Sequence, residues 1–164
     1  MPGVRCIEIK MQQKYIDYIP NVLLVFQYIE EAIRQYLLRC ESITAARLHG
    51  ITKYRISEKD IDKLSLGGLV DKFKKFNDNE NLVKGLRSII VERNFIAHQS
   101  YVALHGKGGK LKEIEEIEPL YERAVKAKES AEKCFLELVQ EIGKLEERFT
   151  KIQRMTEPAT SAGG

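Results

Sequence analysis

The sequence has few of the features that mark membrane, fibrous or disulfide-linked proteins. No run of 18 apolar residues occurs, and the longest apolar run covers only residues 22–26, so we expect no transmembrane helix. The first residues lack the apolar segment of a secretory signal. With 11 glycines and 4 prolines in 164 residues, the composition excludes a collagen-like chain. These absences predict a globular protein of the cytoplasm.

Cysteine is also scarce. The three cysteines, Cys6, Cys40 and Cys134, are far apart, and no C-x-x-C pair or other zinc-ligand spacing is present. We therefore expect reduced thiols in or near the core, and neither a metal site nor a cofactor.

The composition that remains is that of a folded domain. Hydrophobic residues make up 43% of the chain and charged residues 31%, which is too apolar for a disordered protein. A length of 164 residues fits one domain. We expect a single helical domain over 1–154 and a disordered tail over 155–164, because the tail is rich in small and polar residues.

Positive charge is concentrated in the middle of the chain. Residues 39–112 hold 15 Lys and Arg against 8 Asp and Glu, a net charge of +7, whereas the whole chain carries +3. This distribution suits an anionic partner, and an ordinary solvated surface is the alternative.

Apolar residues at spacings of three and four predict a first long helix. It extends from residue 12 to Cys40, or as far as Leu48, with Gly50 as its stop. Pro20 either starts a new helix in its first turn or kinks a longer one. Residues 1–10 fit a short strand or an irregular lead-in.

Shorter helices are predicted in the middle of the chain. Residues 57–60 resemble a helix start with an acidic first turn, and Ser65 can cap a short helix. Residues 77–79 form a turn cluster in which Asp78 or Asn79 can cap the next helix. The apolar stripe of that helix consists of Leu82, Leu86, Ile89, Ile90 and Ile96. Residues 105–112 predict a glycine-rich basic loop, which would form the tip of a hairpin if 101–104 and 111–114 pair as strands.

The last predicted helix is the longest. Pro119 suits its first position, and apolar residues then recur every three or four positions for about 36 residues, a length of about 54 Å. This exceeds the roughly 30 Å expected across a small domain, so the helix either packs partly on a second chain or braces several shorter helices. The fold class is all-α, an up-and-down bundle of four to five helices with a long C-terminal helix.

One segment carries a chemical signal. Asn94 and His98 are four residues apart, so they share one face of a helix, and the long side chain of Arg93 can swing to the same place. An imidazole can move a proton near neutral pH, and a guanidinium can bind a phosphate. This set suits phosphodiester cleavage, whereas an ion-paired Arg and a partly buried His are the alternative.

The run from Arg93 to His98 resembles the R-x4-6-H motif of the HEPN superfamily, in which a polar residue often follows the arginine, as Asn94 does here. The segment 65–70 also resembles one common in these proteins. The resemblance covers about residues 12–150 and implies a helical bundle with the motif near the end of a late core helix. Many such domains are metal-independent endoribonucleases that act as toxins or defence effectors.

The resemblance also assigns roles to residues. His98 would act as general acid or base, Arg93 would bind the scissile phosphate with support from Asn94, and the product would carry a 2′,3′-cyclic phosphate. Two protomers usually pair so that both motifs face one cleft, which implies a homodimer. The alternative is a non-catalytic RNA-binding or assembly module with an antitoxin or nucleotidyltransferase partner.

Two further expectations concern the residues after the motif. In the variety of the family paired with a nucleotidyltransferase, a modified tyrosine follows the histidine by two positions, where this chain has Ser100, so Tyr101 is the remaining candidate. Tyr101 and three lysines are also expected to bind RNA, because the lysines beside the glycine-rich loop can contact its backbone. These lysines are Lys107, Lys110 and Lys112.

Overall fold

The fold is an all-α bundle built around two long helices. A computed structural model describes residues 2–52, 58–105 and 112–156, and within these ranges it describes the side chains from 10 to 151. The helices are α1 (Pro2–Leu48), α2 (Glu58–Asp62), α3 (Leu66–Phe73), α4 (Glu80–Gln99) and α5 (Ile114–Thr156), with a short 3-10 helix, η1 (Val102–Leu104), after α4. The predicted fold class is confirmed, with no strand in the described ranges.

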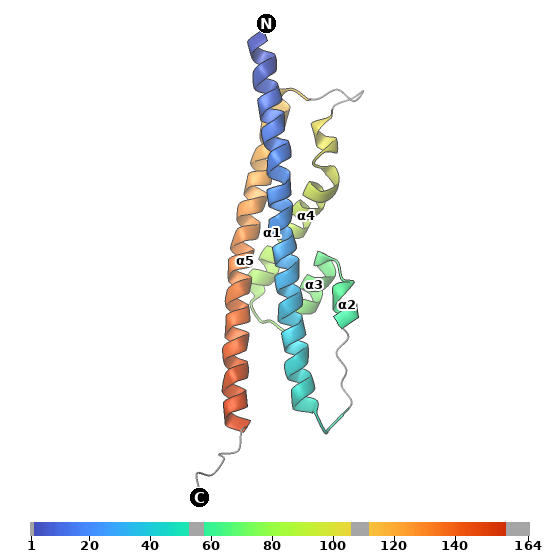
Figure 1. Ribbon diagram of the computed structural model, residues 1–164, viewed down its shortest axis with the longest axis vertical. Helices are drawn as coiled ribbons and strands as arrows, with labels where there is room; N and C mark the ends of the chain where they lie inside the picture. The colour runs from blue at the N-terminus through green and yellow to red at the C-terminus, as the bar shows by residue number, and fades with distance from the viewer. Residues whose placement is uncertain (1, 53–57, 106–111, 157–164) are drawn as a thin grey trace, which may run out of the picture.

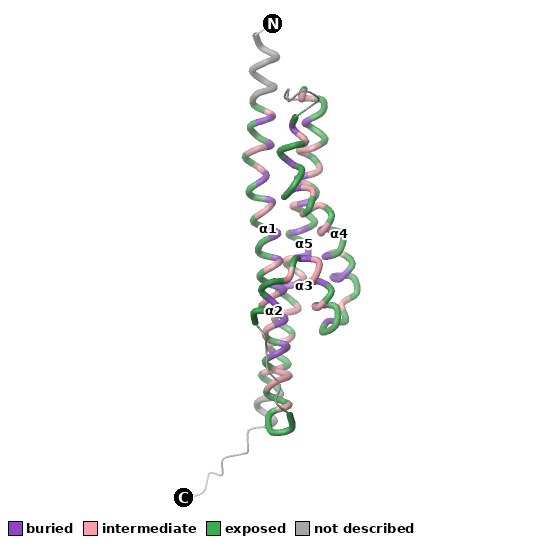
Figure 2. The backbone as a smooth tube through the Cα atoms, turned by 90° about the vertical axis from the view of Figure 1, so that its right-hand side faces the viewer, coloured by how far each residue is buried: buried purple, intermediate pink, exposed green. Residues whose placement is uncertain are grey.

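The two long helices lie side by side and run in the same direction (Figure 1). Their 47 and 43 residues correspond to about 70 and 65 Å. Aromatic rings meet between them where Tyr18 packs on Tyr121 and Tyr28 on Phe135. Buried positions recur along both helices (Figure 2), and those of α1 step by three and four from Tyr15 to Cys40. Such a seam favours helix pairing.

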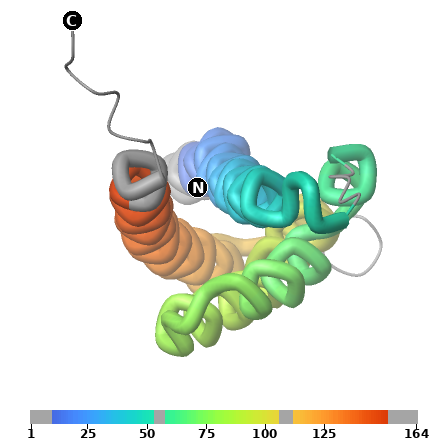
Figure 3. The backbone as a smooth tube through the Cα atoms, turned by 90° about the horizontal axis from the view of Figure 1, so that it is seen from below, coloured from blue at the N-terminus to red at the C-terminus, as the bar shows by residue number. Residues whose placement is uncertain are grey.

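The shorter helices gather on one side of this pair (Figure 3). Helix α4 runs opposite to α1 and α5 (Figure 1) and packs on both, whereas α3 lies between α1 and α4. The core therefore lies between α1, α4 and α5 and is completed by buried side chains of α2 and α3. Gly85 of α4 gives α5 room there, because a Cβ at this position would come within 3.0 Å of the Cys134 Sγ.

Several predicted helix ends are confirmed. The first helix ends at Leu48, and Gly50 follows with a φ of 83°, a conformation that costs glycine little. Ser65 caps α3 by accepting from the Gly68 N–H, and Asn79 caps α4 by accepting from the Leu82 N–H. Ser57 lies outside the described residues.

Other element predictions were wrong near the two long helices. Residues 2–10 are helical rather than a strand or lead-in, because extending an existing helix costs less than starting one. Of the two alternatives for Pro20, the structure shows the position inside a longer helix, since α1 continues through it with the ring on the exposed side. Pro119 likewise lies inside α5, in the second turn of a helix that begins at Ile114.

The prediction that residues 101–104 and 111–114 pair as the strands of a hairpin was also wrong. Val102–Leu104 is a 3-10 helix, and Ile114 already belongs to α5. The Lys112 N–H donates to the Leu104 carbonyl at 2.9 Å, so the chain does return on itself here, without a ladder of paired strands among the described residues. At the other end, α5 continues to Thr156, and residues 157–164 of the predicted tail lie outside the described residues.

The two described thiols are buried and free, as expected. Burial raises the pKa of Cys40 to about 11 and also raises the pKa of Cys134. A thiol that stays protonated is a poor nucleophile, so both act as packing groups. The side chain of Cys6 lies outside the described residues.

A polar network ties the turn before α4 to the two long helices. The Asn77 side-chain amide donates to the Tyr36 hydroxyl at 3.1 Å and to Glu141 at 3.0 Å. Asn79 and Lys144 also donate to Glu141, at 3.2 and 2.8 Å. Because this turn fixes where α4 begins, the network sets the position of everything farther along that helix.

Glu141 makes stability depend on pH. Partial burial raises its pKa, but the hydrogen bonds from Lys144, Asn77 and Asn79 outweigh burial and hold the pKa below the ordinary value of 4.5. Its stabilising effect is therefore present above that value and is lost as the pH falls through the lower folded-state pKa. We expect urea denaturation to give an acid loss of stability that is smaller in Glu141→Gln. Glu147→Gln, an exposed carboxylate on the same helix, should keep the wild-type pH dependence, and equal profiles for both variants would contradict this role.

Candidate functional site

The motif lies in the second half of α4. The buried stripe of this helix includes Leu82, Leu86, Ile89 and Ile96, which turns the opposite side toward solvent. Asn94 and His98 are both exposed on that side. They line one open depression together with Val91, Phe95 and Gln99 of α4 and Arg123 of α5. The predicted shared face of Asn94 and His98 is confirmed.

Arg93 does not reach this depression. Five residues along an α-helix correspond to a rotation of about 140° between Arg93 and His98. The Arg93 guanidinium instead lies 3.3 Å from Glu30 of α1, which also pairs with Arg34 at 3.7 Å. The structure does not bring the Arg93 side chain to the His98 site, because its direction points it between α4 and α1.

Arg123 supplies the cation at the depression. Its Nε donates to the Glu92 Oε2 at 2.8 Å, and its Nη2 donates to the Glu92 Oε1 at 3.2 Å. The guanidinium also stacks on the Phe95 ring, 3.6 Å from the ring centroid. Sequence reasoning missed this residue, since it lies on another helix and no local spacing connects it to His98.

The residues after His98 fall into two groups. Ser100 is buried, and its hydroxyl donates to the Ile96 carbonyl at 2.6 Å. Tyr101 is exposed but does not line the depression. Ser100, two positions after His98, is therefore inaccessible, whereas Tyr101, three positions after His98, is accessible.

The predicted RNA-binding lysines are only partly described. Lys112 is half-buried, and its ammonium lies 3.6 Å from Glu116. Lys107 and Lys110 lie outside the described residues. Nearby, the exposed ring of His105 contacts the Tyr101 carbonyl through Nδ1 at 3.0 Å.

Tyr15 is a buried polar group on α1. Burial raises its pKa to about 12, against an opposing effect of Arg123. Its hydroxyl has no hydrogen-bond partner among the described residues. Tyr15 therefore stays protonated at neutral pH.

The described residues contain neither a cluster suited to a metal ion nor a helix suited to a membrane. No group of three or more His, Cys, Asp and Glu side chains in these ranges could hold a metal ion. None of the helices there combines the length and apolar character needed to cross a bilayer. No protein-family model, no curated protein and no solved structure matches this chain.

Proposed function

We propose that this chain is a metal-independent endoribonuclease of the HEPN type, a cytoplasmic toxin or defence effector whose active site is completed in a homodimer. The observation that carries the proposal is the pairing of exposed Asn94 and His98 beside Arg123 in one open depression. In RNA cleavage without a metal, an imidazole can transfer the proton, a guanidinium can stabilise the charge on the phosphate and an amide can orient either of them. The resemblance of the motif to that family supports the same reaction.

The reaction needs one base and one acid. His98 removes the proton from a ribose 2′-hydroxyl, and the 2′-oxygen attacks the adjacent phosphorus. The bond from phosphorus to the 5′-oxygen breaks, and a protonated imidazole gives that oxygen a proton. The products are a 2′,3′-cyclic phosphate and a 5′-hydroxyl.

A second copy would supply the acid. The depression contains one imidazole, His98, so a two-fold dimer places a second His98 at the same cleft. Exposed apolar residues just after the motif favour such a contact, since Tyr101 is 49% and Val102 70% exposed.

Either of two arginines, Arg93 or Arg123, can bind the scissile phosphate. The family resemblance favours Arg93, which must then leave Glu30. The geometry favours Arg123, which already lines the same depression as His98. In that case Arg93 positions α4 against α1.

One observation favours the alternative, a non-catalytic RNA-binding or assembly module. Both guanidinium groups near the motif are engaged, Arg93 with Glu30 and Arg123 with Glu92. An antitoxin or nucleotidyltransferase partner fits this reading, because Tyr101 is exposed.

The test is an RNA cleavage assay with purified protein in EDTA. We expect cleavage of a mixed RNA to persist in EDTA and to leave 2′,3′-cyclic phosphate ends, detected by the failure of the products to ligate until a phosphatase that opens and removes the cyclic phosphate is added. Loss of cleavage on EDTA treatment would contradict a metal-independent mechanism. Intact RNA at every protein concentration would favour the non-catalytic module.

A further inference from the structure

The exposed side of α4 continues well beyond the motif. Going back from His98 and Asn94, the same face carries Val91, Arg87 and Lys84, at steps of three and four residues. All five side chains are exposed. They form a single line along the helix, which we call the α4 stripe. Arg87 lies about 16 Å from His98 along the helix axis.

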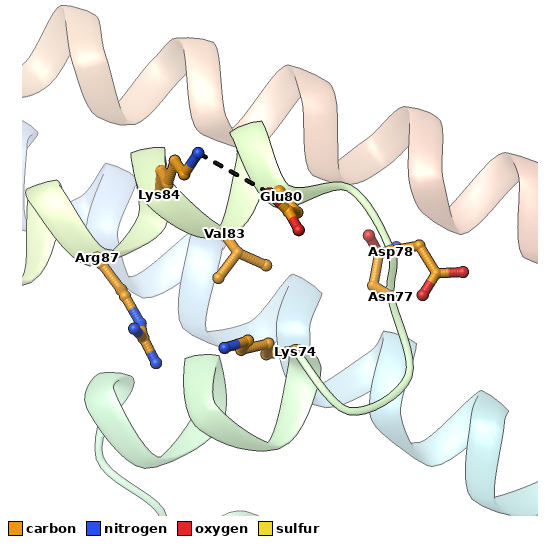
Figure 4. Close-up of a pocket in the computed structure, with 7 residues that line it drawn as sticks. All are labelled: Lys74, Asn77, Asp78, Glu80, Val83, Lys84 and Arg87. Atoms are coloured by element: carbon orange, nitrogen blue, oxygen red, sulfur yellow. Dashed lines mark ion pairs between the residues drawn. The ribbon is translucent and has the colours of Figure 1, made fainter.

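A second, separate pocket lies at the far end of the α4 stripe. It lies between α3 and the start of α4, has a volume of about 380 Å³, and is lined by Lys74, Lys84 and Arg87 among others. Figure 4 shows the ends of Lys74 and Arg87 pointing toward one another across the gap between the two helices. Lys84 lines the same pocket with its ammonium turned toward Glu80, away from Lys74 and Arg87 (Figure 4), and this exposed side chain must rotate to join them.

The carboxylates at this pocket leave the cations available. Lys84 lies 3.9 Å from Glu80 and Arg87 lies 2.9 Å from Asp71, and all four side chains are more than half exposed. Pairs this exposed contribute about 0–1 kcal/mol, so a phosphate can replace the carboxylate. Asp78 also lines the pocket but points away from Lys74 and Arg87 (Figure 4).

Lys74 is the least engaged of the three cations. No ion pair joins it to any residue in the described ranges. Its ammonium therefore gives up no ion pair within the described ranges when it binds an anion.

We propose that Lys74, Lys84 and Arg87 form a phosphate-binding subsite that holds the RNA backbone at a distance from His98, with the strand lying along the α4 stripe. The inference rests on the proposed function, because it takes RNA as the ligand. At about 3.4 Å per nucleotide in a stacked strand, the span from Arg87 to His98 corresponds to about five nucleotides. An RNA must then exceed this length to occupy both sites.

The experiment measures RNA binding separately from cleavage. A fluorescein-labelled RNA of about twelve nucleotides is titrated with His98→Ala protein, and anisotropy is read from about 50 to 200 mM salt. The two substitutions Lys84→Gln and Arg87→Gln are then added together to the His98→Ala protein, which is the background for all binding measurements. The matched control carries Lys133→Gln with Lys151→Gln, two exposed lysines of α5. Both pairs remove two positive charges, so net charge alone cannot separate them.

We expect the Lys84 and Arg87 pair to weaken binding about tenfold and to flatten the slope of log K against log salt by about 1.4, the loss of two single-strand phosphate contacts. The control pair should change neither by more than about twofold. An RNA of about four nucleotides, too short to reach from Arg87 to His98, should bind the His98→Ala protein more weakly than the RNA of about twelve nucleotides.

The outcomes separate the subsite from the proposed activity. Equal binding by the stripe and control variants, with wild-type cleavage intact, overturns the subsite alone. Selective weakening with a wild-type protein that does not cleave RNA supports the subsite and overturns the nuclease. No RNA binding by the His98→Ala background overturns the subsite. The subsite would also be overturned if the protein self-associates in the absence of RNA and the Lys84 and Arg87 variant does not. That result would assign the α4 stripe to contact with a second copy.

Discussion

Replacing His98 by alanine should slow RNA cleavage by about 10²–10⁴-fold, the usual contribution of one general acid or base. In a dimer the change removes both imidazoles, so the upper part of this range is expected. RNA binding should change by less than about threefold, because the substitution removes one side chain and leaves in place the lysines and arginines that bind phosphate. Initial rates with a fluorescent RNA and anisotropy on the same preparation measure the two effects separately.

The matched control is His49→Ala. His49 is also an exposed histidine, located just after α1 and outside the motif. Its replacement should leave the cleavage rate within about twofold of wild type. Cleavage that survives in His98→Ala would assign the activity to another site or to a contaminating nuclease.

Arginine variants decide which guanidinium serves the phosphate. Arg123→Ala should lower cleavage if the depression seen here is the reacting cleft, and Arg93→Ala should do so if the ion pair with Glu30 opens on binding. Glu30→Gln separates a structural role for Arg93 from a catalytic one, because it breaks the same ion pair and leaves the guanidinium in place. Cleavage that survives both arginine substitutions would contradict phosphate binding by either.

Replacing Asn77 by alanine should lower the free energy of unfolding by about 2–4 kcal/mol. The change removes a donor to the Glu141 carboxylate and the acceptor of the Asn79 N–H at 2.8 Å. A hydrogen bond to a charged group contributes about 1.5–3 kcal/mol, and each buried partner left unpaired adds to the loss. Urea denaturation monitored by circular dichroism measures it.

Asp78→Ala is the control for that change. Asp78 is the exposed neighbour of Asn77 in the same turn, and its replacement should alter stability by no more than about 0.5 kcal/mol. Equal losses in the two variants would mean that the turn itself, rather than the Asn77 side chain, carries the stability. A loss in Asn77→Ala should also reduce RNA cleavage at temperatures close to its unfolding midpoint, since the turn sets the position of α4.

Much of the fold follows from local rules. The apolar spacing predicts the long helices, and the caps at Ser65 and Asn79 and the stop at Gly50 were predicted from the residue types alone. These features depend on contacts within about one helical turn, which a sequence displays directly. The ends of the long helices were less predictable. Proline suggested a boundary or a kink at Pro20 and a boundary at Pro119, but both helices continue through their prolines, because packing along α1 and α5 outweighs the loss of one backbone hydrogen bond.

The candidate site also has one feature that follows from local sequence and another that depends on the packing of the helices. That Asn94 and His98 share an exposed face was determined by the sequence, because their spacing of four residues fixes their relative direction on any helix. The partners of the two arginines were decided only by the tertiary structure. Arg93 meets Glu30, and Arg123 reaches the His98 depression, because α1, α4 and α5 pack with one particular rotation and register. Contacts between residues separated by 25 or 63 positions along the chain depend on that packing, and no local periodicity encodes it.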